Sequence, residues 1–226
     1  MNAVNITSVE RAQRGLARVW IDFESALVQV PVIARLTTGR LRIEDYRALL
    51  LNLRQQVVEG SRWIGRAASH LTARHETLRS LFVKHTAAEH RDFLLLERDF
   101  AATGGDPALM AITPKNIGSE ALSAFMYHTA SQPDPVGMLG AMFIIEGLGH
   151  RLAEPWAEAI KHQLAVGDEA VRFLRYHGEG DDAHMAMFDQ ALALAVTDDS
   201  TADAVVRHAK IVARLYRLQL EELDNV

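Results

Sequence analysis

The sequence predicts an all-α protein, a single domain of about seven helices that covers residues 1–226. Three observations support this fold class. Apolar residues recur three and four positions apart, strand-like alternation is hard to find, and no low-complexity linker separates two halves. With 226 residues, of which 49% are hydrophobic and 23% charged, the chain can bury a sizeable core.

The first two predicted helices are separated by turn residues. The helical period covers residues 7–29, with Ser8 as the expected N-cap, and Pro31 ends this helix or starts another. Gly39 lies in a break before the next helix. We expect that helix over residues 43–71, because its apolar residues keep the same period.

Five more helices follow by the same period, and they are separated mostly by groups of glycine, proline or polar residues. They are expected at residues 76–102, 117–130, 136–163, 168–195 and 201–220. The middle helix of these five is very apolar, although Gly147, Gly149 and Pro155 interrupt it. Short connections between helices of this length predict a bundle around one core.

The composition excludes several classes of function. A formal net charge of −5 gives no electrostatic reason to bind nucleic acid or anionic lipid. The chain has no cysteine, which excludes disulfides, thiolate zinc sites and cysteine nucleophiles. The apolar stretches are too short to span a membrane, and Glu10, Arg11 and Arg14 stand where a signal peptide has an apolar block. We therefore expect a cytoplasmic protein with no nucleic-acid or membrane partner.

Two of the predicted helices each carry three metal-ligand-type side chains at positions i, i+4 and i+7, a spacing that places them on one helical face. These side chains are His85, Glu89 and Asp92 in one helix, and His177, Asp181 and His184 in the other. Taken alone, either set is more often a solvated face than a binding site.

A third group is centred on Glu146, which lies within the apolar run of residues 142–148, with His150 one turn later. Burying a carboxylate without partners costs several kcal/mol. Glu146 is therefore expected to face a cation, a hydrogen-bond network or a solvated pocket, and an arginine ion pair is the alternative. Acids and imidazoles that project inward from several helices, without sulfur, favour iron or manganese over structural zinc.

Gly178 and Gly180 interrupt the second set of ligand-type residues. Each glycine weakens a helix by about 1 kcal/mol relative to alanine. Two interpretations stay open: a slight kink without consequence, or a segment that becomes ordered when His177, Asp181 and His184 bind metal.

These residues resemble a known family, the haem-oxygenase-like fold superfamily (the TenA/PqqC-like fold), and within it the branch of non-haem di-iron oxidases and oxygenases. The resemblance spans roughly residues 20–195. It is carried by residues 30–39 with Tyr46 and residues 52–56, by residues 139–147, and by His177, Asp181 and His184 with their spacing.

The resemblance implies a set of metal ligands. Members that bind metal use a glutamate and a histidine from their first core helix, a glutamate from the second, and histidine or aspartate ligands that end in a histidine from the third. Four residues match the second and third helices, namely Glu146, His177, Asp181 and His184. In the first helix, Glu89 stands for the glutamate while Asp92 replaces the histidine; in another alignment His85 and Asp92 take the two places.

Other branches of the superfamily fit less well. Haem-binding members use a histidine of the first helix, and no histidine precedes His70, so no haem is expected. Thiaminase-like members use a cysteine and a helical aspartate, whereas this chain has no cysteine and carries Asn52 near the aspartate's place. Cofactorless, PqqC-like oxidases stay possible, because their chemistry needs only histidines and a pocket.

The leading hypothesis is an iron-dependent oxidase or oxygenase, with one or two ions of iron (or manganese) and no haem, that acts on a small organic substrate and dioxygen. Phe143, Met142 and Phe93 would line a dry cavity, or else simply pack in the core. The alternative is a metal-free protein of this fold that binds a small molecule or a partner. A homodimer is also possible, with an interface formed by tryptophans that otherwise belong to the core, Trp20, Trp63 and Trp156.

Overall fold

The computed structural model describes residues 6–179 and 181–225, except for the side chains of residues 179 and 181–185. The regular structure of these residues is helical throughout, which confirms the predicted all-α class. The helices are α1 (Ser8–Leu27), α2 (Pro31–Thr37), α3 (Ile43–His70), α4 (Glu76–Glu89), α5 (Phe93–Ala102), α6 (Pro107–Ile112), α7 (Ile117–Ala130), α8 (Met138–Leu148), α9 (Glu154–Leu164), α10 (Arg172–Glu179), α11 (Asp181–Ala195) and α12 (Asp199–Glu221). Three short helical segments lie between them, η1 (Ala73–His75), η2 (Gly149–Ala153) and η3 (Asp168–Ala170), and a fourth, η4 (Glu222–Asp224), follows α12.

The described part of the chain has more helices than the predicted seven. Two long predicted helices are interrupted, two short helices, α2 and α6, lie outside the predicted ranges, and the helix expected at 168–195 is described as α10 and α11 on either side of residue 180. The helix expected at 76–102 is divided into α4 and α5 by a turn at residues 90–92. The helix expected at 136–163 becomes α8 and α9, joined by the π-helical segment η2. Pro155 lies in the first turn of α9, where a missing N–H costs no intrahelical hydrogen bond.

The first helices also begin where local hydrogen bonds favour them. The N-cap of α1 is Thr7 rather than the expected Ser8: the Thr7 hydroxyl accepts a hydrogen bond from Glu10 N at 3.2 Å, and Glu10 Oε2 accepts one from Thr7 N at 2.8 Å. Pro31 starts a new helix, α2, which its fixed φ favours.

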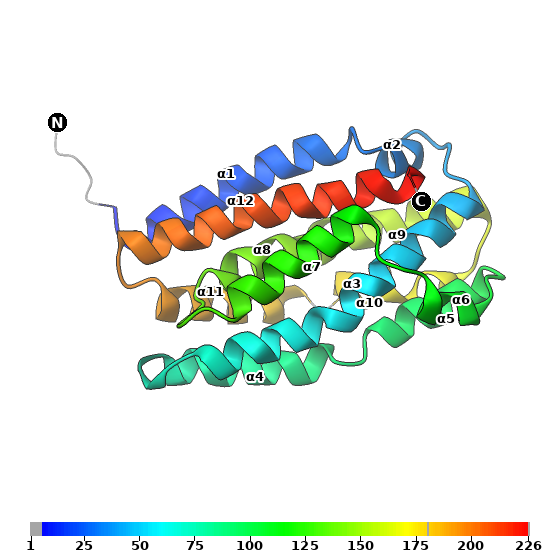
Figure 1. Ribbon diagram of the computed structural model, residues 1–226. Helices are drawn as coiled ribbons and strands as arrows, with labels where there is room; N and C mark the ends of the chain where they lie inside the picture. Colours follow the sequence, from blue (N-terminus) through cyan, green and yellow to red (C-terminus); the bar gives the residue numbers. More distant parts are fainter. Residues whose placement is uncertain (1–5, 180, 226) are drawn as a thin grey trace, which may run out of the picture.

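The helices form an elongated bundle (Figure 1). The last helix, α12, packs against α1, α7 and α8, while α3 packs against α4, α5 and α7. In Figure 1 the pair α1 and α12 therefore lies along one side of the bundle and the pair α3 and α4 along the other. The apolar core between them includes Leu16, Tyr46, Phe82, Met126 and Ile144, all of which are buried.

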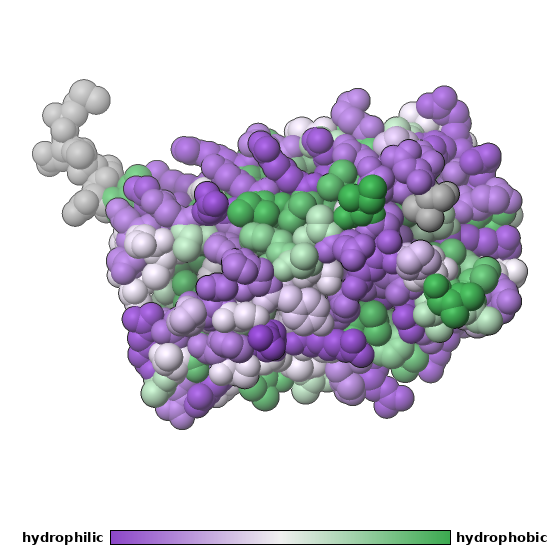
Figure 2. Space-filling view, viewed as in Figure 1, coloured by the Kyte–Doolittle hydropathy of each residue, from purple (hydrophilic) through white to green (hydrophobic). Residues whose placement is uncertain are grey.

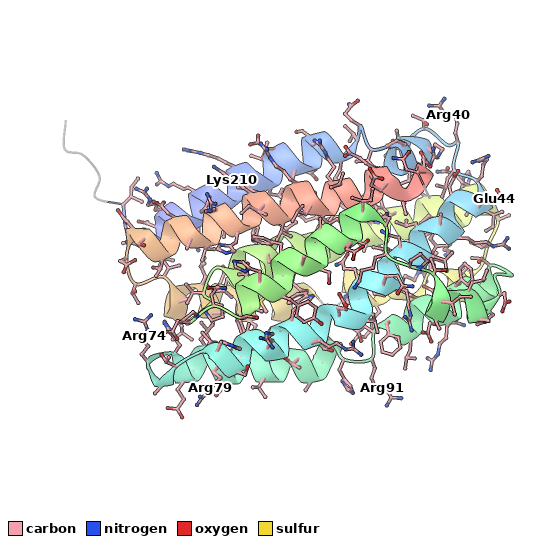
Figure 3. All side chains as sticks on the ribbon, in the orientation of Figure 1. Arg40, Glu44, Arg74, Arg79, Arg91 and Lys210 are labelled. Atoms are coloured by element: carbon pink, nitrogen blue, oxygen red, sulfur yellow. The ribbon has the colours of Figure 1, made fainter. Side chains whose placement is uncertain are left out.

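The surface of the bundle is mainly polar on the face shown in Figure 2. Apolar patches interrupt it where α7 begins and over α6, which carry the exposed side chains of Ile117 and Ile112. Charged side chains such as Arg79 and Arg91 point away from the bundle at its lower edge (Figure 3). None of the described helices is long and apolar enough to cross a membrane.

The close approach of α8 to α12 depends on Gly140. A Cβ atom at this position would lie 2.0 Å from the carbonyl oxygen of Val205 and 2.7 Å from the backbone nitrogen of Ala209. Since both of these atoms belong to the backbone of α12, the two helices could not keep this distance with a larger residue. Gly140 thereby fixes the depth at which α8, the helix that carries Glu146, lies in the bundle.

We expect Gly140→Ala to lower the free energy of unfolding by about 1–3 kcal/mol, the cost of overpacking a well-packed core. Gly60→Ala is the matched control, because its added Cβ would lie 4.0 Å from Trp63 Cζ2, at ordinary contact distance. In this control alanine should stabilise α3 by up to about 1 kcal/mol. Urea unfolding of the three proteins measures both effects, and equal stability of Gly140→Ala and wild type would contradict the prediction.

Candidate metal centre

Five of the predicted ligand-type residues meet at one place in the bundle. His85 and Glu89 come from α4, Asp92 from the turn after α4, Glu146 from α8 and His177 from α10. Ligand atoms of His85, Glu89 and Glu146 all lie within 4.8 Å of one another, and so do those of Glu89, Asp92 and His177. Glu89 belongs to both groups and joins them into a single cluster.

Two direct contacts cross between the helices of this cluster. His85 Nε2 lies 3.2 Å from Glu146 Oε1, and the two side chains are 5% and 20% exposed. His177 Nε2 lies 3.6 Å from Asp92 Oδ2. Glu146 thus contacts an imidazole, and the cluster is largely shielded from solvent.

The local chain conformation explains how the first three residues converge. His85 and Glu89 are one helical turn apart in α4, so their side chains project from the same face. The i+7 spacing predicts that Asp92 lies on the same helical face. In the structure α4 ends at Glu89, so Asp92 lies beyond the end of this helix. The turn of residues 90–92 nevertheless brings the Asp92 carboxylate to the same cluster.

The charges of the cluster shift the pKa values of Glu89 and His85. Burial, together with the negative charge of Glu146 and a hydrogen bond with Asp92, raises the pKa of Glu89 to about 8. Burial lowers the pKa of His85, but the hydrogen bond and charge of Glu146 outweigh this effect, and the net pKa is raised. In the absence of a cation, Glu89 therefore keeps its proton at neutral pH and His85 favours its charged form.

The donor set fits divalent metal ions. Three carboxylates and two imidazoles provide oxygen and nitrogen ligands, the mixture that suits iron and manganese in helical bundles. Asp92 Oδ2 is buried, yet no hydrogen bond to it is formed by the described residues. A cation would satisfy this atom and offset the carboxylate charge, and Glu89 could contact two ions at once because it belongs to both groups.

Two of the predicted ligands, Asp181 and His184, have side chains outside the described part of the structure. Their backbone belongs to the beginning of α11, which packs against α4 and α8, the helices that carry His85 and Glu146. His150, one turn beyond Glu146, is exposed. Gly178 and Gly180, for which a kink and a metal-ordered segment were the two interpretations, belong to this region, and Gly180 is not among the described residues.

Sequence reasoning missed the residues that hold α10, and therefore His177, in place. The buried carboxylate of Asp99, in α5, accepts hydrogen bonds from Arg172 N at 3.1 Å and from Phe173 N at 2.9 Å, at the start of α10. The Tyr46 hydroxyl donates a hydrogen bond of 2.7 Å to the carbonyl of Ala170 just before it. Asp99 directly follows Glu97 and Arg98 in the sequence, so it lacks the apolar surroundings that marked Glu146.

A glycine next to the cluster permits close packing of α10. Gly149 begins the π-helical segment that follows α8, and a Cβ atom there would lie 3.1 Å from the carbonyl oxygen of His177. π-Helical turns occur frequently at functional sites, where they alter the direction of a helix. Here the turn follows Glu146 directly and faces the helix that carries His177.

A cavity of about 100 Å³ opens beside the cluster, and we call it the first cavity. Glu89, Glu146 and His177 form one end of it. Its other walls are mainly apolar side chains of α3, α8, α9, α10 and α12, among them Leu53, Val57, Trp63, Ile145, Trp156 and Tyr216. Trp63 and Trp156 therefore line this cavity. Trp20 is buried in the core, which was the predicted alternative to a place in a dimer interface.

Comparison with known proteins points in the same direction as the geometry. A protein family described as iron-containing redox enzymes matches residues 62–217, which include all seven predicted ligands. No curated protein matches the chain.

Solved structures resemble the whole chain. A domain from Shewanella denitrificans with a haem-oxygenase-like fold has a TM-score of 0.87 and 18% identity, over 92% of this chain and 90% of that chain. A TenA homologue from Pseudomonas syringae has a TM-score of 0.76 and 13% identity, over 93% and 92% of the two chains. A TenA homologue from P. horikoshii has a TM-score of 0.73 and 12% identity, over 96% and 98%. These matches confirm the predicted haem-oxygenase-like fold.

The buried position of Asp99 predicts a specific dependence of stability on pH. Burial, which outweighs the hydrogen bonds from Phe173 N and Arg172 N, raises the pKa of Asp99 from 3.8 to about 6. The folded protein therefore holds this proton more tightly than the unfolded chain, and stability falls as pH rises from about 4 to 6. We expect the stability of wild type relative to Asp99→Asn to fall by up to about 3 kcal/mol over this range, as measured by urea unfolding between pH 4 and 7.

Asp198→Asn is the control, because its pKa is shifted in the opposite direction. A backbone hydrogen bond from Thr201 N lowers the pKa of Asp198 below 3.8, so this carboxylate adds stability that is lost as pH falls. The stability of wild type relative to Asp198→Asn should therefore rise with pH. If the stability of wild type and of Asp99→Asn changed equally with pH, the raised pKa of Asp99 would be contradicted.

Proposed function

Because the chain belongs to the family of iron-containing redox enzymes, we propose that it is a non-haem iron oxidase or oxygenase that acts on a small organic substrate. The observation that carries this proposal is the shared position of Glu89, whose carboxylate lies within reach of both ligand groups. One ion would be held by His85, Glu89 and Glu146, and a second by Glu89, Asp92 and His177. Bound iron would supply the redox chemistry with dioxygen that these side chains lack.

The protein side chains would have distinct tasks. The carboxylates of Glu89, Asp92 and Glu146 would offset the charge of the ions, and Glu89 would give up its proton when metal binds. His85 and His177 would fix the positions of the ions from opposite sides of Glu89. Asp181 and His184 are proposed as further ligands through the family resemblance and their place at the beginning of α11.

The first cavity is proposed as the binding site of the organic substrate. It ends at Glu89, Glu146 and His177, so a bound molecule would contact the metal centre at one end. Its apolar walls would exclude water and favour a substrate with an apolar body. A polar wall residue, Gln56, is held by a 2.6 Å hydrogen bond from Gln219 Nε2 to its Oε1 and can orient a polar substrate group.

The proposed sharing of Glu89 predicts how metal content responds to substitution. Wild type reconstituted anaerobically with ferrous iron should hold about two ions per chain, as in carboxylate-bridged helical bundles. Glu89→Gln should lose most of both ions, because one substitution removes a ligand from each group. His85→Gln and Asp92→Asn should each lose about half, since each removes a ligand from one group only. Elemental analysis after gel filtration measures the content.

Glu120→Gln is the matched control, since Glu120 is an exposed carboxylate of α7, outside both ligand groups. It should bind as much iron as wild type. Glu89→Gln with the iron content of this control would refute the shared-ligand site. A folded wild type that binds neither iron nor manganese would favour a metal-free binding protein or a cofactorless oxidase of the same fold.

A further inference from the structure

A second cavity, of about 30 Å³, lies on another side of the metal centre, among α4, α8 and α11. Among the residues with described side chains, its polar contacts are His85 and Glu146. Its other walls are apolar, and they include Leu81, Phe82, Leu139, Met142, Phe188 and Ala191. One of the residues expected to line a dry cavity, Met142, is therefore found here, whereas Phe143 packs against Trp20 and Phe188.

The size of this cavity limits what it can contain. A single water molecule needs a cavity of about 10–15 Å³, so a cavity of about 30 Å³ has room for a molecule of two or three atoms. A water molecule also needs two to four polar partners, and cavities with apolar walls stay dry and take up apolar guests such as xenon. The cavity is too small for an organic substrate, and its mainly apolar walls favour a small apolar gas, with a water molecule held by His85 and Glu146 as the competitor.

The two cavities reach the metal centre from different sides. The first cavity contacts Glu89, Glu146 and His177, and the second contacts His85 and Glu146. Glu146 therefore lies between the two cavities. A substrate in the first cavity would cover the His177 side of the centre and leave the His85 side accessible only to a molecule small enough for the second.

We propose that the second cavity binds dioxygen and delivers it to the His85 side of the metal centre while the organic substrate occupies the first cavity. This inference rests on the proposed function, since it assumes a metal that reacts with dioxygen. It adds that the two reactants occupy separate cavities, and that α11 contributes to the path of the gas through Phe188 and Ala191.

The first test uses xenon, which binds apolar cavities and needs no iron. Crystals of the full chain under xenon pressure should show a xenon atom in the second cavity. Ala191 is the residue to change, because it is small and buried on the cavity wall, and Ala191→Leu should fill the cavity and abolish xenon binding. Ala193→Leu, at an exposed position of the same helix, is the matched control and should keep the xenon in the second cavity.

The second test measures how fast dioxygen oxidises the ferrous protein in stopped-flow experiments. Ala191→Leu should slow this oxidation by about tenfold or more, which corresponds to about 1.4 kcal/mol of added barrier. Ala193→Leu should leave the rate within about twofold of wild type, because the side chain of Ala193 is exposed and lines neither cavity. Ala191→Val, a smaller enlargement, should give an intermediate rate and serves if the leucine variant does not fold.

The results separate this inference from the proposed function. An iron-loaded wild type without xenon in the second cavity, or an Ala191→Leu variant oxidised at the wild-type rate, overturns the dioxygen cavity and leaves the iron site standing. A protein that takes up xenon but loads no iron overturns the proposed function, and the assignment of dioxygen falls with it.

Discussion

The mutual repulsion of three buried carboxylates is the constraint on which the rest of this structure depends. Glu89, Asp92 and Glu146 lie in a small volume from which water is largely excluded, and two imidazoles stand beside them. Such a cluster is costly unless protons or cations compensate its charge. The raised pKa of Glu89 expresses this cost in the metal-free state, because the carboxylate keeps a proton that it would lose in water.

The fold keeps this cluster together by fixing each helix that contributes to it. Gly140 lets α8 lie close against α12, which places Glu146 at its depth in the bundle. Asp99 and Tyr46 bind the start of α10 and so position His177 from a distance. The contacts of Asp99 and Tyr46 are made by buried polar groups that cannot exchange partners with water, so the start of α10 is held by the protein itself. The π-helical segment after Glu146 belongs to the same arrangement, since it faces α10 across Gly149.

Much of the fold followed from the sequence, and part of the site did too. The period of apolar residues predicted most helices, although it could not show the interruption at residues 90–92, where the apolar pattern continues across a turn. Glu146 was identified because a carboxylate in an apolar helix requires compensation, whereas Asp99 was missed because it follows Glu97 and Arg98 and reads as part of a charged surface. Asp92 was assigned to a helical face that ends before it, and it reaches the cluster through the turn instead.

The sequence by itself determined the helical class, the absence of sulfur ligands, and the acids and imidazoles available for a site. These properties depend on composition and on neighbours within one or two helical turns, which a linear pattern records. Only the tertiary structure decided that Glu89 is shared by two ligand groups, that Asp99 caps the helix of His177, and that Glu146 separates two cavities. These relations join segments far apart in the chain, and their distances are set by how helices pack rather than by any local preference.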